Sequence, residues 1–534
     1  MRQTASGERL TLTLLAILSA ALRVVAYLRF RFDSDEPQHL HVTWGWTAGL
    51  LQYRDLFDNH APLFHILSAP LLRVAGERSD VLFFMRAPML LLFAVVLWAT
   101  YVLGRRLYSA RVGVWAALLL SFFPPFFLKS LEYRTDNLWN ALWMTAVAVL
   151  VLSRRSSAAF FMAGLLLGGA LGVSLKTTLL LITLAGAGAV TYVMRRRDER
   201  VGIRPLRFVA FAIGMAIVPT TIAAYFVSRG AWSNFIDCAF RFNKLVAVTR
   251  APMMVWGPRL LFVPLIVITM RIAWRYRMRT TNARFFLAVA TAIFFLALGG
   301  FWILISPRDF LPFLPFVSIF AVAALARRPH FVRNVTVLMI VLLIGVGYYA
   351  EWLTNRTREF VTMERQVLSL TRPGELVMDY KGETIYRRRP YYFILEFITR
   401  NAILHGLVRD TVPEDLVRTE CHVAQADGTQ WPDRARGFMA ANFLNLGRLR
   451  ASGQWIGRDG SFSIAIPGKY VIIGAAGSPR GLLDGTPYRE ARQLTAGVHT
   501  FKFEIGGGGE RLACLWAPAW WRGFSPFHLR DVDF

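Results

Sequence analysis

The chain has 534 residues, of which 55% are hydrophobic and 14% aromatic, and it carries a formal net charge of +27. Its mean hydropathy of +0.41 excludes an ordinary soluble protein of this length. Three cysteines, Cys238, Cys421 and Cys514, form no CxxC pair, so the sequence contains no zinc or redox motif of that kind.

Eleven apolar segments reach, or nearly reach, the length of about 20 residues that crosses a bilayer as a helix. They lie at residues 10–30, 81–103, 112–128, 138–152, 158–175, 178–194, 208–227, 260–274, 285–305, 310–326 and 332–349. We therefore predict an α-helical polytopic membrane protein with about 11 transmembrane helices. Lys176 and Thr177 alone separate the fifth and sixth segments, which form a tight hairpin or one interrupted helix. Arg23 inside the first segment, and the spans that follow it, favour an uncleaved first span over a signal peptide.

The basic residues are concentrated on one side of these predicted spans. With a cytoplasmic N-terminus, the inside segments carry 21 Lys and Arg against three acids, whereas the outside loops before the C-terminal region carry 13 against 11. This asymmetry is the positive-inside rule, and it explains most of the basic charge. We therefore expect no nucleic-acid partner. The odd number of spans places the region after Glu351 outside.

The first outside loop, residues 31–80, is dense in acids and histidines. They are Asp33, Asp35, Glu36, His39, His41, Asp55, Asp58 and His60. Ionisable groups beside a bilayer are costly, so this clustering indicates a functional site, although such residues could also simply solvate an exposed loop. Residues 37–53 have apolar side chains at near-helical spacing and predict an amphipathic helix at the membrane interface. Asp35 and Glu36 lie at its start, where the helix dipole favours acids.

The sequence predicts two domains, a transmembrane domain at 1–354 and a soluble domain on the outer face at 355–534. In the soluble domain, GELVMDYKG predicts a strand and turn, and YYFILEFITRNAIL predicts a helix. Further along, FSIAIPGKYVIIGAAG alternates like strands, and HTFKFEIGGGGERLACLWA predicts a hairpin around a glycine turn. The expected fold is mixed α/β followed by a β-sandwich-like part. Cys421 and Cys514 both lie here, and a disulfide between them is one option.

An acidic pair after the first span, followed by a Y-R-D-x-F stretch before the second, resembles the GT-C glycosyltransferases. The resemblance is to the group that contains the protein O-mannosyltransferases and the bacterial lipid A aminoarabinose transferase. Asp35-Glu36 matches the DE pair of that group. Residues 58–63, DNHAPL, resemble its D-x-H-P-P-L stretch, with Ala61 in place of the first proline.

Three later motifs fit the same resemblance and keep its order. Tyr133-Arg134-Thr135-Asp136 corresponds to a P-D step, with Thr135 in place of the proline. Residues 164–177, GLLLGGALGVSLKT, resemble a glycine-rich hairpin that ends near Lys176, and residues 306–312, SPRDFLP, resemble an R-Y-x-x-P step in which Asp309 replaces the aromatic. The resemblance covers about residues 10–326.

The resemblance implies the GT-C fold and a multi-pass enzyme of the cell inner (plasma) membrane. The reaction would transfer a sugar, with inversion, from a polyprenyl-phosphate donor to a hydroxyl of a lipid, glycan or protein acceptor on the exoplasmic face. Loop 31–80 would be catalytic, with Asp35 as the base, Asp33 as its rival and Glu36 orienting the acceptor. Lys176 and Arg308 would hold the lipid phosphate. The other residues expected to bind substrate are Asp58, His60, Arg134 and Asp136.

Several alternatives remain at the level of sequence. No cofactor is assigned, but Asp33-x-Asp35 and the histidines could bind a divalent metal; the spacing of His39 and His41 argues against joint ligation on a helix. Lys176 could instead be an interfacial anchor surrounded by membrane lipids, and Arg308 a counter-ion of Asp309. Other functions are a transporter or flippase of lipid-linked glycans, an enzyme like the O-antigen ligases, or a non-catalytic scaffold. A transporter would need ionisable residues near the membrane midplane.

Overall fold

The computed structural model describes residues 2–153, 156–194, 205–248, 262–276, 280–301, 305–350, 354–426, 431–503 and 511–529. The chain divides into two compact units. Unit 1 comprises residues 1–32, 59–68 and 82–356, and unit 2 comprises residues 33–58, 69–81 and 357–534. Most of the first outside loop therefore belongs to the same unit as the C-terminal region.

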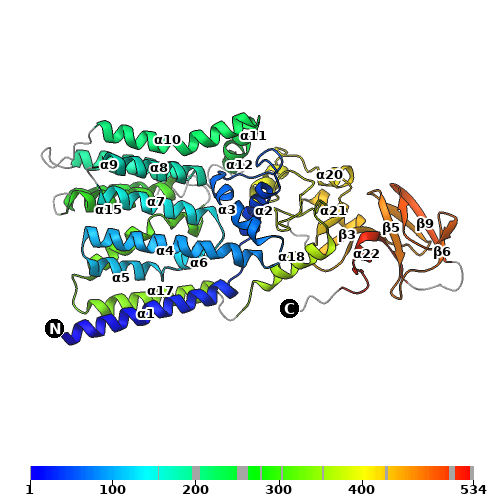
Figure 1. The fold of residues 1–534 in the computed structure, drawn as a ribbon, viewed down its shortest axis with the longest axis horizontal. Coiled ribbons are helices and arrows are strands. Elements are labelled where there is room, and N and C mark those ends of the chain that lie inside the picture. The colour runs from blue at the N-terminus through cyan, green and yellow to red at the C-terminus, as the bar shows by residue number, and fades with distance from the viewer. Residues whose placement is uncertain are drawn as a thin grey trace. The chain divides into compact units, whose positions relative to one another are not determined.

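Unit 1 is a bundle of helices, whose long members run alongside one another (Figure 1). The long and medium helices are α1 (Arg2–Arg29), α4 (Val81–Leu107), α5 (Ala110–Leu120), α7 (Thr135–Leu152), α8 (Ser157–Val173), α9 (Thr177–Met194), α10 (Pro205–Ser228), α14 (Phe262–Tyr276), α15 (Asn282–Phe301), α16 (Leu314–Leu325) and α17 (Phe331–Ala350). The short elements are α6 (Pro124–Lys129), α11 (Trp232–Ile236), η2 (Asp237–Arg241), α12 (Phe242–Val248) and η4 (Pro307–Phe310). Helix α3 (Leu63–Ala75) begins in unit 1 and ends in unit 2.

Each predicted span overlaps a helix in the described part of the chain, although α16 begins only at Leu314 of the span predicted at 310–326. Positions 260–261 and 302–304 of two spans lie outside the described residues. Among the described residues, six helices are long and apolar enough to cross a membrane, namely Ser6–Arg29, Val81–Leu107, Thr177–Met194, Pro205–Ser228, Asn282–Gly300 and Phe331–Ala350. The predicted span at 112–128 differs, because α5 ends at Leu120 and α6 begins at Pro124. Pro124 and Pro125 cannot donate the backbone hydrogen bonds that would continue α5. Residues 174–176 join α8 to α9 as separate helices.

The glycines of the predicted hairpin motif let α8 and α10 pack backbone to backbone. A Cβ atom on Gly164 would lie 2.1 Å from the carbonyl oxygen of Phe211, and one on Gly168 would lie 2.4 Å from that of Met215. Gly214 on α10 approaches the carbonyl of Phe161 equally closely. Such small-residue contacts are how helices associate closely in a membrane. The glycine pattern therefore has a packing role in unit 1.

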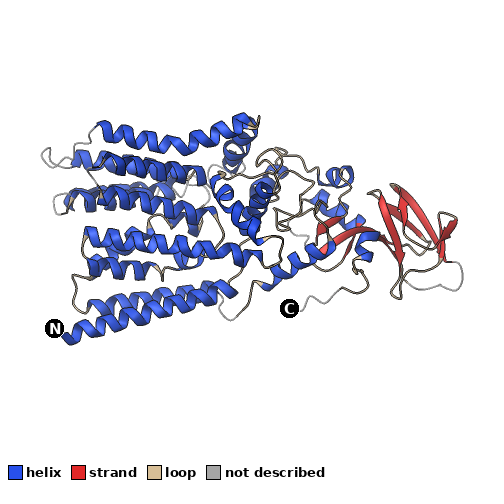
Figure 2. Ribbon diagram, in the orientation of Figure 1, coloured by secondary structure: helices blue, strands red, loops and turns tan. Residues whose placement is uncertain are grey.

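Unit 2 combines helices with two antiparallel sheets, drawn in red in Figure 2. Its helices are α2 (Asp35–Thr47), α18 (Arg358–Leu370), α19 (Phe397–Leu404), α20 (Val412–Arg418), α21 (Asp433–Asn442) and α22 (Ala517–Trp521). Its strands are β1 (Val423–Gln425), β2 (Phe443–Asn445), β3 (Leu449–Trp455), β4 (Ser461–Ile464), β5 (Gly468–Ile473), β6 (Gly481–Leu483), β7 (Thr486–Tyr488), β8 (Arg492–Leu494), β9 (Gly497–Phe503) and β10 (Ala513–Trp516).

The two sheets share a hydrophobic core. The first has the order β1-β3-β10-β5-β8, with β2 also paired to β3, and the second has the order β4-β9-β6-β7. Leu515 of β10 pairs in register with Gly453 of β3 and Val471 of β5. Phe462 and Phe501 from the second sheet join Val471 and Leu515 in one buried cluster. A β-rich C-terminal region is thus confirmed.

Three local predictions for this region were wrong or incomplete. β9 and β10 do not form the predicted hairpin, because they belong to different sheets; the glycine run at 504–510 lies outside the described residues. GELVMDYKG forms only an isolated bridge, between Met378 and Ala424, instead of a strand. The helix predicted in YYFILEFITRNAIL begins only at Phe397. Cys421 and Cys514 are free thiols, each buried in a different cluster.

The predicted orientation can be tested with single introduced cysteines. Val498 is 74% exposed on β9, and the three native cysteines are buried, so they should not react. We expect Val498→Cys to label with a membrane-impermeant maleimide in intact spheroplasts. Ala110→Cys, exposed in a predicted inside segment, should label only after lysis. The reverse pattern would place residues 355–534 in the cytoplasm.

Candidate active-site residues

Two of the acids in the first outside loop accept backbone hydrogen bonds at the start of α2. The Asp33 carboxylate accepts from the backbone N–H of Asp35 at 3.3 Å, and the Glu36 carboxylate accepts from the backbone N–H of Asp33 at 2.7 Å. Asp33 and Glu36 are buried. Unpaired backbone N–H groups at a helix start favour such acidic partners. These two carboxylates therefore stabilise the start of α2.

Asp35 differs from its two neighbours because its carboxylate is partly exposed and forms an ion pair with Lys381 of the same unit. The side chain of Lys381 is only 11% exposed. Burial lowers the pKa of Lys381, but the carboxylates of Asp35, Glu383 and Glu396 outweigh burial and raise it overall. Lys381 is therefore a cation, and it faces Asp35 in a partly water-excluded environment.

The helix that follows Asp35 is buried, so the predicted interfacial amphipathic helix is wrong. α2 ends at Thr47 rather than near Tyr53, and most of its residues are buried, polar ones included. Nδ1 of His41 donates to the carbonyl of Ile385 at 2.7 Å. Burial, together with Arg389, lowers the pKa of His41 to about 4, so this imidazole is neutral. Polar groups at buried positions had given α2 the sequence pattern of a surface helix.

The second acidic motif is divided between the two units. Asp58, in unit 2, is fully buried and accepts from Nε2 of Gln52 at 2.7 Å. His60 lies in unit 1 and is half-buried. Between them, the side chain of Asn59 donates to that of Asn243 at 3.2 Å, and Asn243 donates back to the Asn59 carbonyl. This motif therefore fixes the local path of the chain.

Unit 1 brings four of the predicted substrate-binding residues together in a charge cluster. Its members are Lys129, Glu132, Arg134, Asp136, Lys176, Arg308 and Asp309. Nζ of Lys176 lies 2.6 Å from Asp309 and 3.2 Å from Asp136, and Arg134 lies 3.3 Å from Asp136. Glu132 contacts Arg308 at 2.9 Å and Lys129 at 2.7 Å.

The charge cluster is largely buried. Burial lowers the pKa of Lys176, but Asp136 and Asp309 outweigh it and raise the pKa overall. Lys176 is the most accessible cation of the cluster, because 28% of its side chain is exposed. Lys176 is therefore an ion-paired residue rather than a snorkelling anchor. Arg308 pairs with Glu132, and Asp309 pairs with Lys176.

Potential metal ligands do not gather in the described part of the chain. Within those residues, no group of three or more His, Cys, Asp or Glu side chains is arranged to hold an ion. Asp33, one half of the Asp33-x-Asp35 motif, caps α2.

Comparisons with known proteins agree with this architecture. Residues 59–231 match the family described as dolichyl-phosphate-mannose-protein mannosyltransferase. ArnT from Cupriavidus metallidurans in the apo state has a similar fold, with a TM-score of 0.56 and 14% identity over 82% of this chain and 98% of that chain. The structure of the same protein bound to undecaprenyl phosphate gives a TM-score of 0.52 and 15% identity, over 82% of this chain and 97% of that chain. No curated protein matches the sequence.

The family match covers residues 59–231 and agrees with the resemblance seen in the loop motifs, and the fold is similar to that of ArnT. The family match includes His60, Arg134, Asp136 and Lys176 but begins after Asp35.

Lys381 is a residue that sequence reasoning missed. It lies 346 positions from Asp35, in a stretch that the sequence presented as a strand and turn. One signal was available: Asp379, Lys381 and Glu383 alternate around Gly382, which is an unusual density of charge for a buried turn. Nothing in the sequence indicates that this turn faces the first outside loop.

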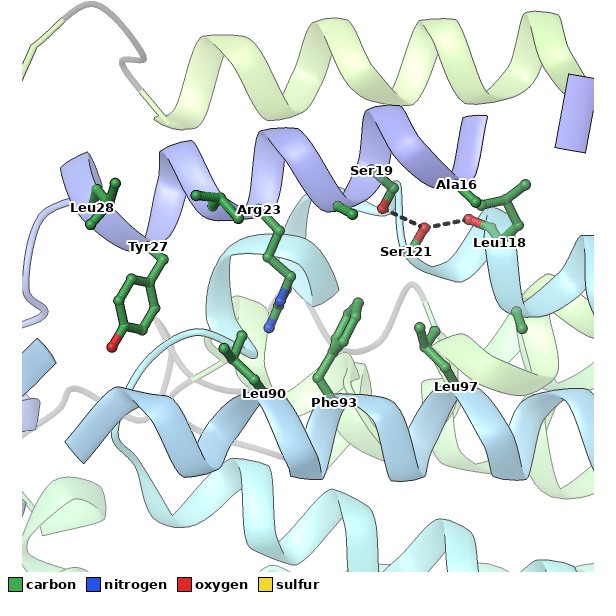
Figure 3. A pocket seen from close by; sticks show the side chains of 13 residues that line it. Ala16, Ser19, Arg23, Tyr27, Leu28, Leu90, Phe93, Leu97, Leu118 and Ser121 are labelled. Atoms are coloured by element: carbon green, nitrogen blue, oxygen red, sulfur yellow. Dashed lines mark hydrogen bonds between the residues drawn. The ribbon is translucent and has the colours of Figure 1, made fainter. Parts of the chain in front are cut away.

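Unit 1 also has an apolar groove of about 680 Å³, formed by α1, α4 and α5 (Figure 3). Arg23 points from α1 into this groove, where its guanidinium lies 3.6 Å from the Phe93 ring centroid. The guanidinium donates to the carbonyls of Phe127 and Ser130, both at 3.1 Å. Ser19 and Ser121 form a hydrogen bond with each other at 3.0 Å. The remaining side chains that line the groove are mostly apolar, and such walls suit an acyl or isoprenoid chain rather than a sugar.

Proposed function

We propose that this protein is a membrane glycosyltransferase of the GT-C class, which transfers a sugar from a polyprenyl-phosphate donor to an acceptor hydroxyl on the exoplasmic face, with inversion at the anomeric carbon. The acceptor is a hydroxyl of a lipid, glycan or protein. The observation that carries the proposal is the Asp35 carboxylate, which is partly exposed and ion-paired, while the buried carboxylates of Asp33 and Glu36 accept backbone hydrogen bonds at the start of α2. An ionised, accessible carboxylate is the group that such a reaction needs as its base.

In the proposed reaction, Asp35 accepts the proton of the acceptor hydroxyl as the hydroxyl oxygen attacks the anomeric carbon. The new glycosidic bond forms while the bond from the anomeric carbon to the phosphate oxygen breaks. The polyprenyl phosphate leaves with the bonding electron pair. A single displacement of this kind inverts the anomeric configuration. Asp33 and Glu36 support this step by fixing the start of α2.

Cations of the charge cluster are proposed to stabilise the leaving phosphate. Lys176 is the most accessible of them, and Arg308 and Arg134 lie in the same cluster. Charge-assisted hydrogen bonds to phosphate are among the strongest that side chains make. The solved structure of ArnT with undecaprenyl phosphate supports the donor class.

The remaining assignments follow the same proposal. Asp58 and His60 contribute to substrate binding, and loop 31–80 is catalytic. The enzyme resides in the cell inner membrane, with a cytoplasmic N-terminus and with residues 355–534 in the periplasm. It requires membrane lipids and no nucleic acid.

The proposal is tested with purified protein in lipid nanodiscs. We expect it to release undecaprenyl phosphate from an undecaprenyl-phosphate sugar when a membrane lipid and glycan extract supplies acceptors. Thin-layer chromatography of radiolabelled donor measures the release, and a nucleotide sugar serves as the control donor. Transfer from the nucleotide sugar alone would reject the lipid-linked donor.

A further inference from the structure

The loop that contains Lys381, residues 379–389, is held in one conformation by its own side chains. The Asp379 carboxylate accepts from the backbone N–H groups of Gly382 and Thr384, both at 2.8 Å, and from the Thr384 hydroxyl at 2.7 Å. Glu383 accepts from the backbone N–H of Lys381 at 2.8 Å. Asp379 and Thr384 are fully buried. Buried, satisfied networks of this kind make a segment rigid.

This loop packs closely against α2. Gly382 has φ of +101°, and a Cβ atom added to it would lie 2.7 Å from Cβ of His41 on α2. The hydrogen bond from His41 to the Ile385 carbonyl secures the same contact. Only glycine allows both the backbone conformation and the approach. The approach places the Lys381 ammonium against the Asp35 carboxylate.

We propose that Lys381 is a positioning residue of the active site, through which the C-terminal region holds the catalytic carboxylate of Asp35 ionised and in place. The inference rests on the proposed role of Asp35 as the base. Lys381 acts through Asp35 rather than on the substrate. The C-terminal region thereby becomes part of the catalytic machinery.

An ammonium beside the base has two consequences for the reaction. The ion pair restricts the Asp35 carboxylate to one orientation, so less side-chain conformational entropy is lost when the acceptor hydroxyl binds. The positive charge also favours the ionised carboxylate, so the proton taken from the acceptor is lost readily afterwards. The other ionisable groups around the pair are Asp33 and Glu36 on α2, and Glu383 and Glu396, which raise the pKa of Lys381. Burial, with Asp379, raises the pKa of Glu383 to about 7.

The first test replaces Lys381 and follows the pH dependence of turnover. We expect Lys381→Met to lower kcat roughly tenfold or more at acidic pH and to move the acidic limb of the profile to higher pH, since the cation no longer favours ionised Asp35. Lys381→Arg should keep the limb near its original position. Lys502→Met, an exposed lysine of the same unit, is the matched control and should change nothing. A fall in kcat that is equal at every pH would overturn the proposal.

The second test moves Lys381 without removing a charge, and it applies even if Lys381→Met does not fold. Gly382→Ala introduces a Cβ that collides with His41, so the loop must shift and weaken the ion pair. Gly374→Ala is the control: its φ is +89°, so backbone strain is comparable, but open space surrounds it. We expect the pH profile to shift in Gly382→Ala and not in Gly374→Ala. Identical profiles in the two variants would overturn the proposal.

Failure of this inference can be told from failure of the proposed function. If Asp35→Asn is inactive while Lys381→Met and Gly382→Ala keep the parent pH profile, the base assignment stands and the role of Lys381 is rejected. If Asp35→Asn is fully active, the base lies elsewhere and both proposals fall.

Discussion

Asp35→Asn is expected to lower the turnover number by roughly 10²–10⁴-fold, the usual contribution of a general base. The substitution keeps the shape of the side chain and an oxygen that can accept from Lys381. The folded protein and its affinity for donor should therefore persist. Transfer rates in nanodiscs, together with a thermal unfolding curve, measure the two effects separately.

Glu36→Gln provides the matched control for this substitution. The amide oxygen of the new Gln side chain can still accept from the backbone N–H of Asp33, so Glu36→Gln should lower the free energy of unfolding by at most about 1 kcal/mol and have a small effect on turnover. Asp33→Asn should behave in the same way. If Asp33→Asn and Asp35→Asn are both severe and a chelator abolishes activity, the Asp33-x-Asp35 motif binds a metal. Parent activity in Asp35→Asn would contradict its assignment as the base.

Lys176→Met is expected to be the most destabilising single substitution in the charge cluster. It leaves Asp136 and Asp309 buried without the cation that both contact. Removing one partner of a buried ion pair lowers the free energy of unfolding by about 3–5 kcal/mol. The lower end of this range applies because 28% of the Lys176 side chain is exposed. A large fall in the unfolding temperature of the detergent-solubilised protein measures the effect. An unchanged unfolding temperature would contradict the buried ion pairing.

A double variant separates this structural role from phosphate binding. Lys176→Met with Asp309→Asn removes one cation and one acid, so much of the lost stability should return. If Lys176 also holds the donor phosphate, donor affinity should remain about ten- to a hundredfold below that of the parent. The pair Arg308→Met with Glu132→Gln applies the same test to Arg308. Full recovery of donor affinity in both pairs would reject the phosphate assignments.

Much of the helical part could be predicted from the sequence because its signals are local. Apolar length identifies the long helices, and Asp35 and Glu36 lie in the first turn of α2 as predicted. The motifs containing Arg134, Asp136, Lys176 and Arg308 also meet in one cluster. Their spacing could not give the pairing, in which Lys176 contacts Asp309 and Arg308 contacts Glu132.

The features that escaped prediction depend on contacts distant in sequence. The partner of Asp35 lies on a loop of the C-terminal region, and no local pattern in α2 points to it. His41 made α2 look like a surface helix, whereas burial and a hydrogen bond to Ile385 accommodate it inside unit 2. β9 and β10 flank a glycine run, but pairing with other strands sends them to different sheets.

The anomeric configuration of the transferred sugar tests the central proposal most directly. A donor labelled with ¹³C at the anomeric carbon is incubated with the enzyme and acceptor, and the one-bond carbon–hydrogen coupling of the product is read by NMR. Direct displacement with Asp35 as the base requires a product inverted relative to the donor, and a rate of product formation that is roughly 10²–10⁴-fold lower with Asp35→Asn. A product that retains the donor configuration would contradict the proposal, because retention requires a second displacement through a covalent intermediate.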